Sequence, residues 1–258
     1  TMALKRGGHY NEYTMIAAAL SEVSVKLDEY IRKEYLLKLK QQETAMRALR
    51  HQINPHFLYN TLEAIQGIAL EHGVPKIADA TGALGKLFRH NIQGSDMIPL
   101  GKELEITQAY LTIQKLRFAD KLNVLISIRE NTRGIPVMKL LLQPLVENAV
   151  YHGLEPKTGP GTLFIGARLE KGDLLISIYD DGVGMPSGRL AALQEELERP
   201  AASGKAETAH IGLLNVQHRI RLRYGMPYGL TLHSTPGGGT RVTVRVPAQT
   251  QEEENELC

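Results

Sequence analysis

The chain lacks several features that would point to other classes of protein. It has no tryptophan, and its single cysteine, Cys258, is the last residue, so no internal disulfide can form. No apolar run approaches the ~20 residues that a membrane span requires, and no signal peptide is present. The 30 basic and 28 acidic side chains nearly cancel and form no basic block, which leaves nucleic-acid binding without support. We therefore expect this chain to be soluble in a reducing compartment and to reach a membrane only through segments outside it.

Residues 10–50 contain no proline and little glycine, and their apolar residues follow a regular spacing. Positions three and four apart form a seam that is typical of a coiled coil, because a repeat of 3.5 residues keeps one face toward a partner helix. The spacing slips at Glu34 and then resumes in another phase, which changes the supercoil locally. The seam consists of Tyr13, Ile16, Leu20, Val23, Leu27 and Tyr30, followed later by Met46, Leu49 and Ile53.

Two further helices are predicted after Pro55, the second over residues 76–93, with a turn at Gly73 and Pro75. Each carries an apolar stripe, and two helices alone cannot bury both stripes. Dimerisation into a four-helix bundle is the natural completion of such a hairpin.

The pattern changes beyond residue 99, where strands and helices interleave. Residues 94–99 are predicted to be a linker. No regular strand–helix–strand repeat is present, which favours an α/β sandwich with a mixed sheet over a doubly wound parallel sheet. The predicted strands are 122–128, 162–169, 174–179, 230–233 and 241–246, the last two forming a hairpin; the predicted helices are 100–118, 137–152, 188–198 and 212–224.

His56 is the first candidate for chemistry. It follows Pro55 directly, at the end of a long helical pattern. A proline inside a helix removes one backbone hydrogen bond and kinks the rod, so we expect the turn around His56 to open and its imidazole to face outward. Such a histidine suits a nucleophile that another domain must reach.

Two polar side chains lie within an apolar helical stretch at 142–153. Asn148 and His152 are four residues apart and therefore share one face of a helix. An amide oxygen is a hard ligand that suits Mg²⁺ bound to a triphosphate. Taken alone, a buried asparagine is more often satisfied by backbone groups.

Three glycine-containing stretches follow in order. Asp180 ends a strand and precedes Gly182 and Gly184, so its carboxylate can accept a hydrogen bond from the adenine amine while the glycines let the backbone approach a ligand. Gly212 opens a helix, where exposed amides favour phosphate. Residues 237–240 would by themselves indicate only a hairpin turn. The joint occurrence of these stretches after Asn148 favours a nucleotide pocket.

These motifs resemble the LytS/YesM-like class of bacterial sensor histidine kinases. Residues 52–62 are similar, nearly letter for letter, to the phosphoacceptor box of that class. Asn148, Asp180–Gly184, Gly212 and Gly239-Thr240 resemble the N, G1, G2 and terminal glycine-threonine boxes of the GHKL (Bergerat) ATP-binding fold. One departure is His210, which stands where the G2 box often has its first glycine.

The resemblance implies a role for each matching residue. His56 is the implied phosphoacceptor, and Asn60, one turn later, is a hypothetical positioner of a water that dephosphorylates the partner protein. Asn148 is the implied Mg²⁺ ligand. Asp180 is implied to accept a hydrogen bond from the adenine amine, and Thr240 to support this contact through its hydroxyl or a water. The remaining implied ATP-binding residues are His152, Gly182, Gly184, Gly212, Leu213 and Gly239, and the implied lid lies between Pro186 and His210.

The resemblance also implies the organisation and the activity. The fold class is α+β: a coiled coil and a two-helix hairpin that dimerises into a four-helix bundle precede the α/β sandwich. The implied activity is ATP-dependent autophosphorylation in a homodimer, with transfer of the phosphoryl group to an aspartate of a response-regulator receiver domain at the cytoplasmic side of the membrane. The implied segments are a signal-relay helix at 1–45 with a HAMP-like remnant at 9–31, a phosphoacceptor domain at 46–95, an ATP-binding domain at 96–248 and a disordered acidic tail at 249–258.

Two alternatives remain open at the level of sequence. One is a GHKL ATPase, which would place a glutamate one helical turn before the asparagine to activate water; here Pro144 stands four residues before Asn148, and it cannot act as a base. The other is a degenerate kinase that serves as a dimeric scaffold. Phe57 follows His56 where many histidine kinases have an acidic residue, so no general base is identified.

Overall fold

The computed structural model describes residues 55–92, 95–199 and 211–248. The chain divides into two units, residues 1–58 and residues 59–258, and the architecture below is that of the second. The predicted coiled coil, the HAMP-like remnant, the kink before His56, His210 and the acidic tail lie outside the described residues.

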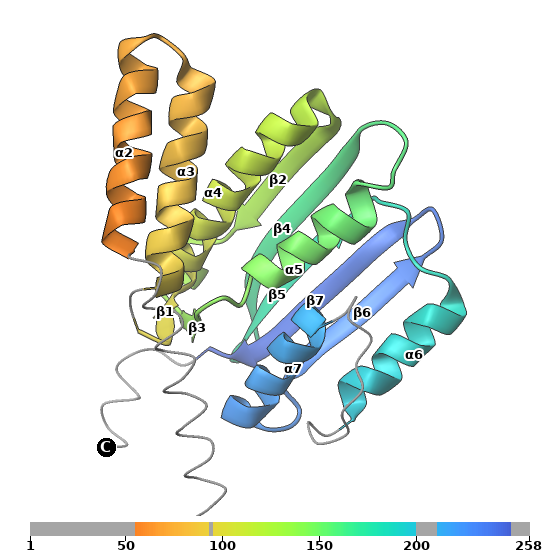
Figure 1. Cartoon of the computed structure of the whole chain (residues 1–258). Coiled ribbons are helices and arrows are strands. Elements are labelled where there is room, and N and C mark those ends of the chain that lie inside the picture. Colours follow the sequence, from red (N-terminus) through yellow and green to blue (C-terminus); the bar gives the residue numbers. More distant parts are fainter. Residues whose placement is uncertain (1–54, 93–94, 200–210, 249–258) are drawn as a thin grey trace, which may run out of the picture. The chain divides into compact units, whose positions relative to one another are not determined.

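The predicted helical hairpin is present. Helix α2 (Pro55–Glu71) and helix α3 (Pro75–Ile92) are joined by a short turn at 72–74 and lie side by side (Figure 1). Gly73 adopts a positive φ of 68°, which glycine accepts without strain, and Pro75 opens α3, where a missing N–H costs nothing. The predicted second helix, 76–93, is therefore confirmed to within a residue.

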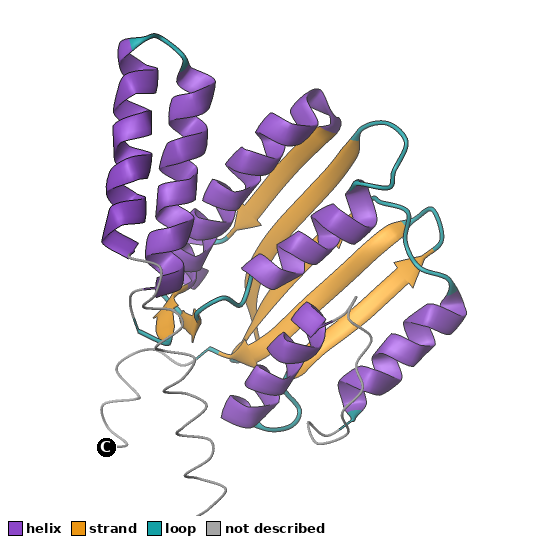
Figure 2. Ribbon diagram, in the orientation of Figure 1, coloured by secondary structure: helices purple, strands orange, loops and turns teal. Residues whose placement is uncertain are grey.

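The larger part of this unit is a five-stranded mixed sheet covered by helices (Figure 2). Strand β2 pairs in parallel with β4, and the other neighbours are antiparallel. The mixed α/β sandwich that the sequence predicts is therefore confirmed. The strands, in sheet order, are β2 (Leu122–Ile128), β4 (Gly161–Glu170), β5 (Asp173–Asp180), β7 (Gly239–Pro247) and β6 (Gly229–Thr235).

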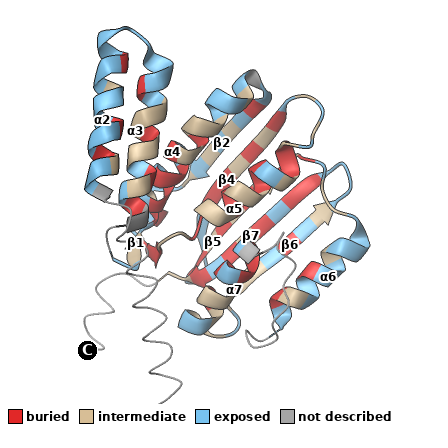
Figure 3. Ribbon diagram, in the orientation of Figure 1, coloured by how far each residue is buried: buried red, intermediate tan, exposed pale blue. Residues whose placement is uncertain are grey.

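The core lies between this sheet and the helices. Alternate residues of β5 and β7, such as Leu174, Ile176 and Val244, are fully buried, whereas their neighbours are partly exposed (Figure 3). This period of two is what one buried sheet face produces. The helices over it are α4 (Leu100–Phe118), α5 (Gln143–Asn148), α6 (Ser187–Glu198) and α7 (Ile211–Tyr224), and short 3₁₀ turns occur at Ala119–Lys121 and Glu130–Thr132.

Two sequence predictions need correction. The helix expected at 137–152 begins only at Gln143, because Pro144 is tolerated in the first turn of a helix but not within one. Strand β3 (Pro136–Met138) occupies its expected start, and its end is a π-helix at Ala149–Leu154. The expected linker at 94–99 contains strand β1 (Met97–Pro99), which pairs with β3.

Within the described ranges, no helix is long and apolar enough to cross a membrane.

Removing a core side chain tests this arrangement. Leu163 of β4 is fully buried between the sheet and the helices. We expect Leu163→Ala to lower the free energy of unfolding by about 2–5 kcal/mol, because it removes buried apolar surface and leaves a cavity. Leu222 is 90% exposed, so Leu222→Ala is the matched control and should change stability by less than about 0.5 kcal/mol. Urea unfolding measures both; equal effects would contradict the described core.

Candidate functional site

A cavity of about 240 Å³ lies where β5 ends and β7 begins. The antiparallel register places Asp180 opposite Thr240, and Asn148 at the end of α5 and His152 in the π-helix line the same cavity. Five residues predicted from sequence to bind ATP therefore line one space. The full lining is Asn148, His152, Gly153, Pro156, Asp180, Val183, Gly184, Met185, Arg189, Leu193 and Thr240.

The other predicted residues do not line this cavity. Gly182 lies in the loop after β5, Gly239 is the first residue of β7, and Gly212 is exposed at the start of α7. Leu213 is buried in the hydrophobic core. Of the predicted lid between Pro186 and His210, the structure describes α6 (Ser187–Glu198), whereas residues 200–210 lie outside the described residues.

Asp180 is the buried acid of the cavity. It is 2% exposed, and its Oδ1 accepts a hydrogen bond from the Gly182 amide at 3.0 Å. Burial raises the pKa of Asp180 to about 6, although the amides of Gly182 and Thr240 favour the carboxylate. A buried acceptor with a perturbed pKa in a cavity is typical of a binding site.

The pKa of the neighbouring Asp181 shifts in the opposite direction. Burial opposes its ionisation, but the Thr162 amide at 2.7 Å and the Lys157 ammonium at 2.9 Å lower the pKa of Asp181. Asp181 therefore ties the end of β5 to the start of β4 as a structural ion, while Asp180 faces the cavity.

Close packing explains the glycines around Asp180. A Cβ at Gly153 would overlap Asp180 Oδ1, and a Cβ at Gly182 would overlap the Gly153 carbonyl. Gly184, at φ 64°, and Gly239, at φ 82°, abut the carbonyls of Thr235 and Asp180 in turn. The glycines let protein segments approach one another around the carboxylate, which is a different use from the ligand approach expected from sequence.

Ser234 is a site residue that sequence reasoning missed. Its Oγ accepts a hydrogen bond from the Met185 amide at 2.9 Å and donates one to the Gly239 carbonyl at 2.9 Å. The single hydroxyl proton of Ser234 is used in the bond to Gly239. In the 2.9 Å contact between Ser234 Oγ and Thr240 Oγ1, the threonine is therefore the donor. The Thr240 hydroxyl is left with its lone pairs as acceptors. No local pattern marks Ser234, because its partners come from other strands and loops.

Gly153 and Arg189 were also missed. Gly153 directly follows His152, and this adjacency to a predicted site histidine is a signal that was available. Arg189 lies on α6 at the rim of the cavity, in a stretch without a recognisable motif.

His56 and Asn60 lie on α2, four residues apart, and both are exposed. Because four residues make about one helical turn, the two side chains share a face. Glu63, further along the same helix, forms an ion pair with Arg89 of α3 at 3.1 Å. His56 belongs to the first unit and the cavity to the second, so the two are described separately.

Comparisons with known proteins match both the region that contains His56 and the region that contains the cavity to protein families. Residues 44–122 match the histidine kinase family model, and residues 137–250 match the model of the histidine kinase-, DNA gyrase B-, and HSP90-like ATPases. The sensor histidine kinase YesM of Bacillus subtilis (strain 168) is 36% identical over 240 residues, which cover 93% of this chain. The chain belongs to the histidine kinase family. The ATPase model over residues 137–250 also shows that the cavity lies in an ATP-binding domain.

Another curated relative and a solved structure are also similar to this histidine kinase chain. Sensor histidine kinase YpdA of Escherichia coli (strain K12) is 32% identical over 249 residues, 93% of this chain. The chain spans 38% of the length of YesM and 42% of that of YpdA. Among solved structures, the histidine kinase domain of the Erythrobacter litoralis EL346 blue-light activated histidine kinase is similar over 75% of this chain and 94% of that domain, with 16% identity and a TM-score of 0.43.

The raised pKa of Asp180 predicts a pH-dependent stability. The folded protein keeps this proton between the ordinary pKa of 3.8 and about 6, so it binds more protons than the unfolded chain and loses stability as pH rises through that window. The difference between the ordinary pKa of 3.8 and a pKa of about 6 lowers the free energy of unfolding by roughly 3 kcal/mol above pH 6. We expect Asp180→Asn, which keeps an acceptor for the Gly182 amide, to be more stable than the wild type at pH 7, with a gain that vanishes toward pH 4.

The matched control is Asp181→Asn. The lowered pKa of Asp181 means that its carboxylate stabilises the fold above its ordinary pKa, so this variant should be less stable at pH 7 and approach the wild type on acidification. Urea unfolding at a series of pH values measures both. A gain for Asp180→Asn that does not change with pH would refute the assignment of the buried proton.

Proposed function

We propose that this chain is the phosphotransfer part of a sensor histidine kinase that phosphorylates His56 from ATP and passes the phosphoryl group to an aspartate of a response-regulator receiver domain. The observation that carries the proposal is the buried Asp180 carboxylate, in one cavity with Asn148, in a chain that also presents an exposed histidine on α2.

The cavity fits an adenine ring. Asp180 offers a carboxylate acceptor to the exocyclic amine, and Thr240, whose proton is held by Ser234, offers a second acceptor to that amine or to a bridging water. Val183, Met185 and Leu193 provide an apolar lining for the ring. Convergent polar groups within an apolar lining are typical of ligand sites.

Asn148 and His152 extend the site toward the phosphates. The Asn148 amide oxygen is a suitable Mg²⁺ ligand, and Arg189 adds a positive charge at the rim. The residues described here contain no group of three or more His, Cys, Asp or Glu side chains that could hold a metal ion, which fits a cation that shares its ligands with nucleotide phosphates and water. When bound, Mg²⁺ would neutralise charge on the transferring phosphoryl group.

His56 is the proposed nucleophile. A neutral imidazole nitrogen attacks the γ-phosphorus in line, the bond to the ADP oxygen breaks as the phosphorus–nitrogen bond forms, and the ring proton is released to solvent. Imidazole is largely neutral at neutral pH, so little activation is required. His56 is exposed on α2, as a histidine that takes a phosphoryl group from bound nucleotide must be.

The helical hairpin supports the proposed homodimer. Ile65, Ile68, Leu70, Val74 and Ile77 expose between 39% and 62% of their surface on α2, α3 and the turn between them. A second copy that covers this stripe would complete a four-helix bundle. We assign residues 46–95 to this dimerisation and phosphoacceptor domain and 96–248 to the ATP-binding domain, preceded by the signal-relay helix at 1–45.

The structure weakens the ATPase alternative. Pro144 stands in the first turn of α5, where a hydrolase would need its base, and Glu147 accepts a hydrogen bond from the Gln143 side chain at 2.7 Å and does not line the cavity. The scaffold alternative is disfavoured because the cavity keeps its buried acid and Asn148.

Incubation with γ-labelled ATP and Mg²⁺ tests the activity. We expect an acid-labile, base-stable label that His56→Gln abolishes. His72→Gln is the matched control, because His72 is also exposed, beside the end of α2. ATP binding without label transfer would leave only the scaffold, and steady release of phosphate without labelling would leave the ATPase.

Asn60 gives a separate expectation. It shares a face of α2 with His56, which supports the proposal that its amide orients a water against a phosphorylated receiver domain. We expect Asn60→Ala to keep autophosphorylation but to slow dephosphorylation of the receiver domain by about 10²-fold, the loss that a misplacement of a reactant by about 1 Å can cause. Full phosphatase activity in this variant would remove the role from Asn60.

A further inference from the structure

A buried carboxylate outside the nucleotide cavity holds the turn that begins α5. Glu103 of α4 is 1% exposed, and its two oxygens accept hydrogen bonds from the Leu142 amide at 3.1 Å and the Leu140 amide at 3.2 Å. Burial raises the pKa of Glu103, while these amides and the charge of Arg219 favour its ionised form. Burial of an ionised carboxyl costs free energy unless hydrogen bonds and nearby charges compensate, as they do here.

The turn that Glu103 holds is a strained one. Leu140 has a φ of 59°, in the left-handed region that residues other than glycine rarely adopt. Arg219 of α7 holds the same turn from its other side, because its guanidinium donates to the carbonyls of Lys139 at 2.5 Å and Leu140 at 3.3 Å. Strained backbone persists only where surrounding contacts over-determine it.

This turn sets the start of a very short helix. Leu142 is the N-cap of α5, and its carbonyl accepts hydrogen bonds from the amides of Leu145 and Val146. Helix α5 has six residues and ends at Asn148. A displacement of Leu142 is therefore transmitted to Asn148 within two helical turns. Asp180 is fixed separately, by the pairing of β5 with β4 and β7.

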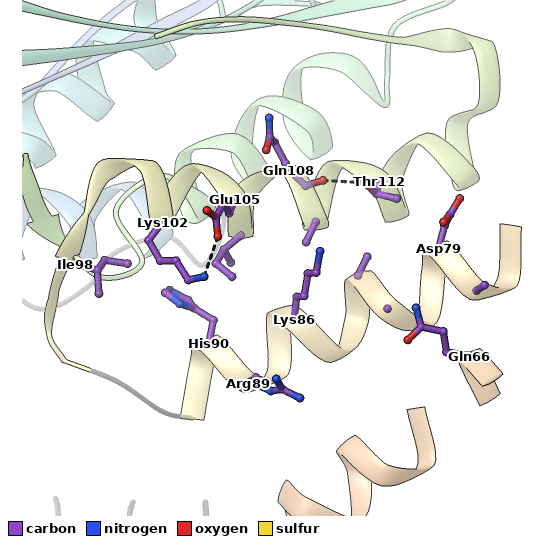
Figure 4. Close-up of a pocket in the computed structure, with 15 residues that line it drawn as sticks. Gln66, Asp79, Lys86, Arg89, His90, Ile98, Lys102, Glu105, Gln108 and Thr112 are labelled. Carbon is purple, nitrogen blue, oxygen red and sulfur yellow. Dashed lines mark hydrogen bonds and ion pairs between the residues drawn. The ribbon is translucent and has the colours of Figure 1, made fainter. Parts of the chain in front are cut away.

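We propose that Glu103 is a positioning residue of the nucleotide site: by holding the strained turn at 139–142 it sets α5, and thereby places Asn148 for the metal–phosphate end of ATP. The proposal rests on the proposed function. The second hairpin helix also approaches this carboxylate, since His90 Nε2 of α3 lies 3.5 Å from Glu103 Oε2 and both side chains are buried. Figure 4 shows His90 beside Lys102, in the larger groove of about 880 Å³ between α3 and α4, which contains none of the predicted ATP-binding residues.

The experiment compares Glu103→Gln with Glu105→Gln. Glu105 lies on the same helix but is exposed and paired with Lys102 at 2.8 Å, so it is a matched control (Figure 4). Calorimetry measures binding of ATP with Mg²⁺, of ATP with a chelator, and of adenosine. In Glu103→Gln we expect the tightening of ATP binding by Mg²⁺ to fall by about 10- to 100-fold, as for lost partners of a metal ligand, while adenosine affinity stays at the wild-type value. Glu105→Gln should match the wild type throughout.

A second variant separates positioning from general destabilisation. Glycine adopts a positive φ without strain, so adding Leu140→Gly to Glu103→Gln should restore most of the Mg²⁺-dependent tightening. Full tightening in Glu103→Gln would overturn the proposal, and so would an equal loss of adenosine binding that Leu140→Gly does not rescue.

Hydrogen exchange gives a readout that needs no nucleotide. The amides of Leu140 and Leu142 should exchange faster in Glu103→Gln than in the wild type or in Glu105→Gln. If the wild type binds no ATP, the proposed function fails, and the exchange rates still decide whether Glu103 holds the turn. Unchanged exchange at both amides would overturn the proposal even if the wild type binds ATP well.

Discussion

The site depends on one steric constraint: the Asp180 carboxylate occupies space that a side chain at residue 153 would need. Gly153 lets the π-helix lie against the carboxylate, Gly182 lets the following loop lie against Gly153, and Gly239 lets the last strand begin against the Asp180 carbonyl. Segments from three parts of the chain are thus packed more closely than any Cβ would permit. This contact buries Asp180, raises its pKa and makes it an acceptor shielded from water.

The two ends of the cavity are held by different elements, the sheet at one end and short helices at the other. The sheet fixes Asp180 and Thr240 through the antiparallel register of β5 and β7, so the proposed adenine end is rigid. The other end depends on a short α5 and a π-helix, elements with few hydrogen bonds of their own. π-helical turns occur frequently at functional sites. The buried Glu103 and the guanidinium of Arg219 supply from outside the fixation that the short helix lacks.

The sequence prediction succeeded where the signal is local. The strand at 122–128 and the helix at 100–118 were predicted with their observed bounds, because the apolar period and flanking turns are written within each segment. The prediction failed at residues 137–142, where the apolar run favoured a helix but Pro144 and pairing with β1 produce a short strand and a turn. Ser234 could not be found either, since its partner Met185 lies in a distant loop and its partner Gly239 begins the next strand of the hairpin.

The sequence by itself determined the identity of the candidate site residues: a histidine directly after a proline, an asparagine within an apolar helix, and an aspartate at the end of a strand each carry a distinct functional group in their own side chains. Tertiary structure alone decided which glycines build the carboxylate cradle, which hydroxyl orients Thr240, and how a strained turn precedes Asn148. Those properties arise from contacts between different strands, helices and loops, and such contacts leave no periodic signal in the sequence.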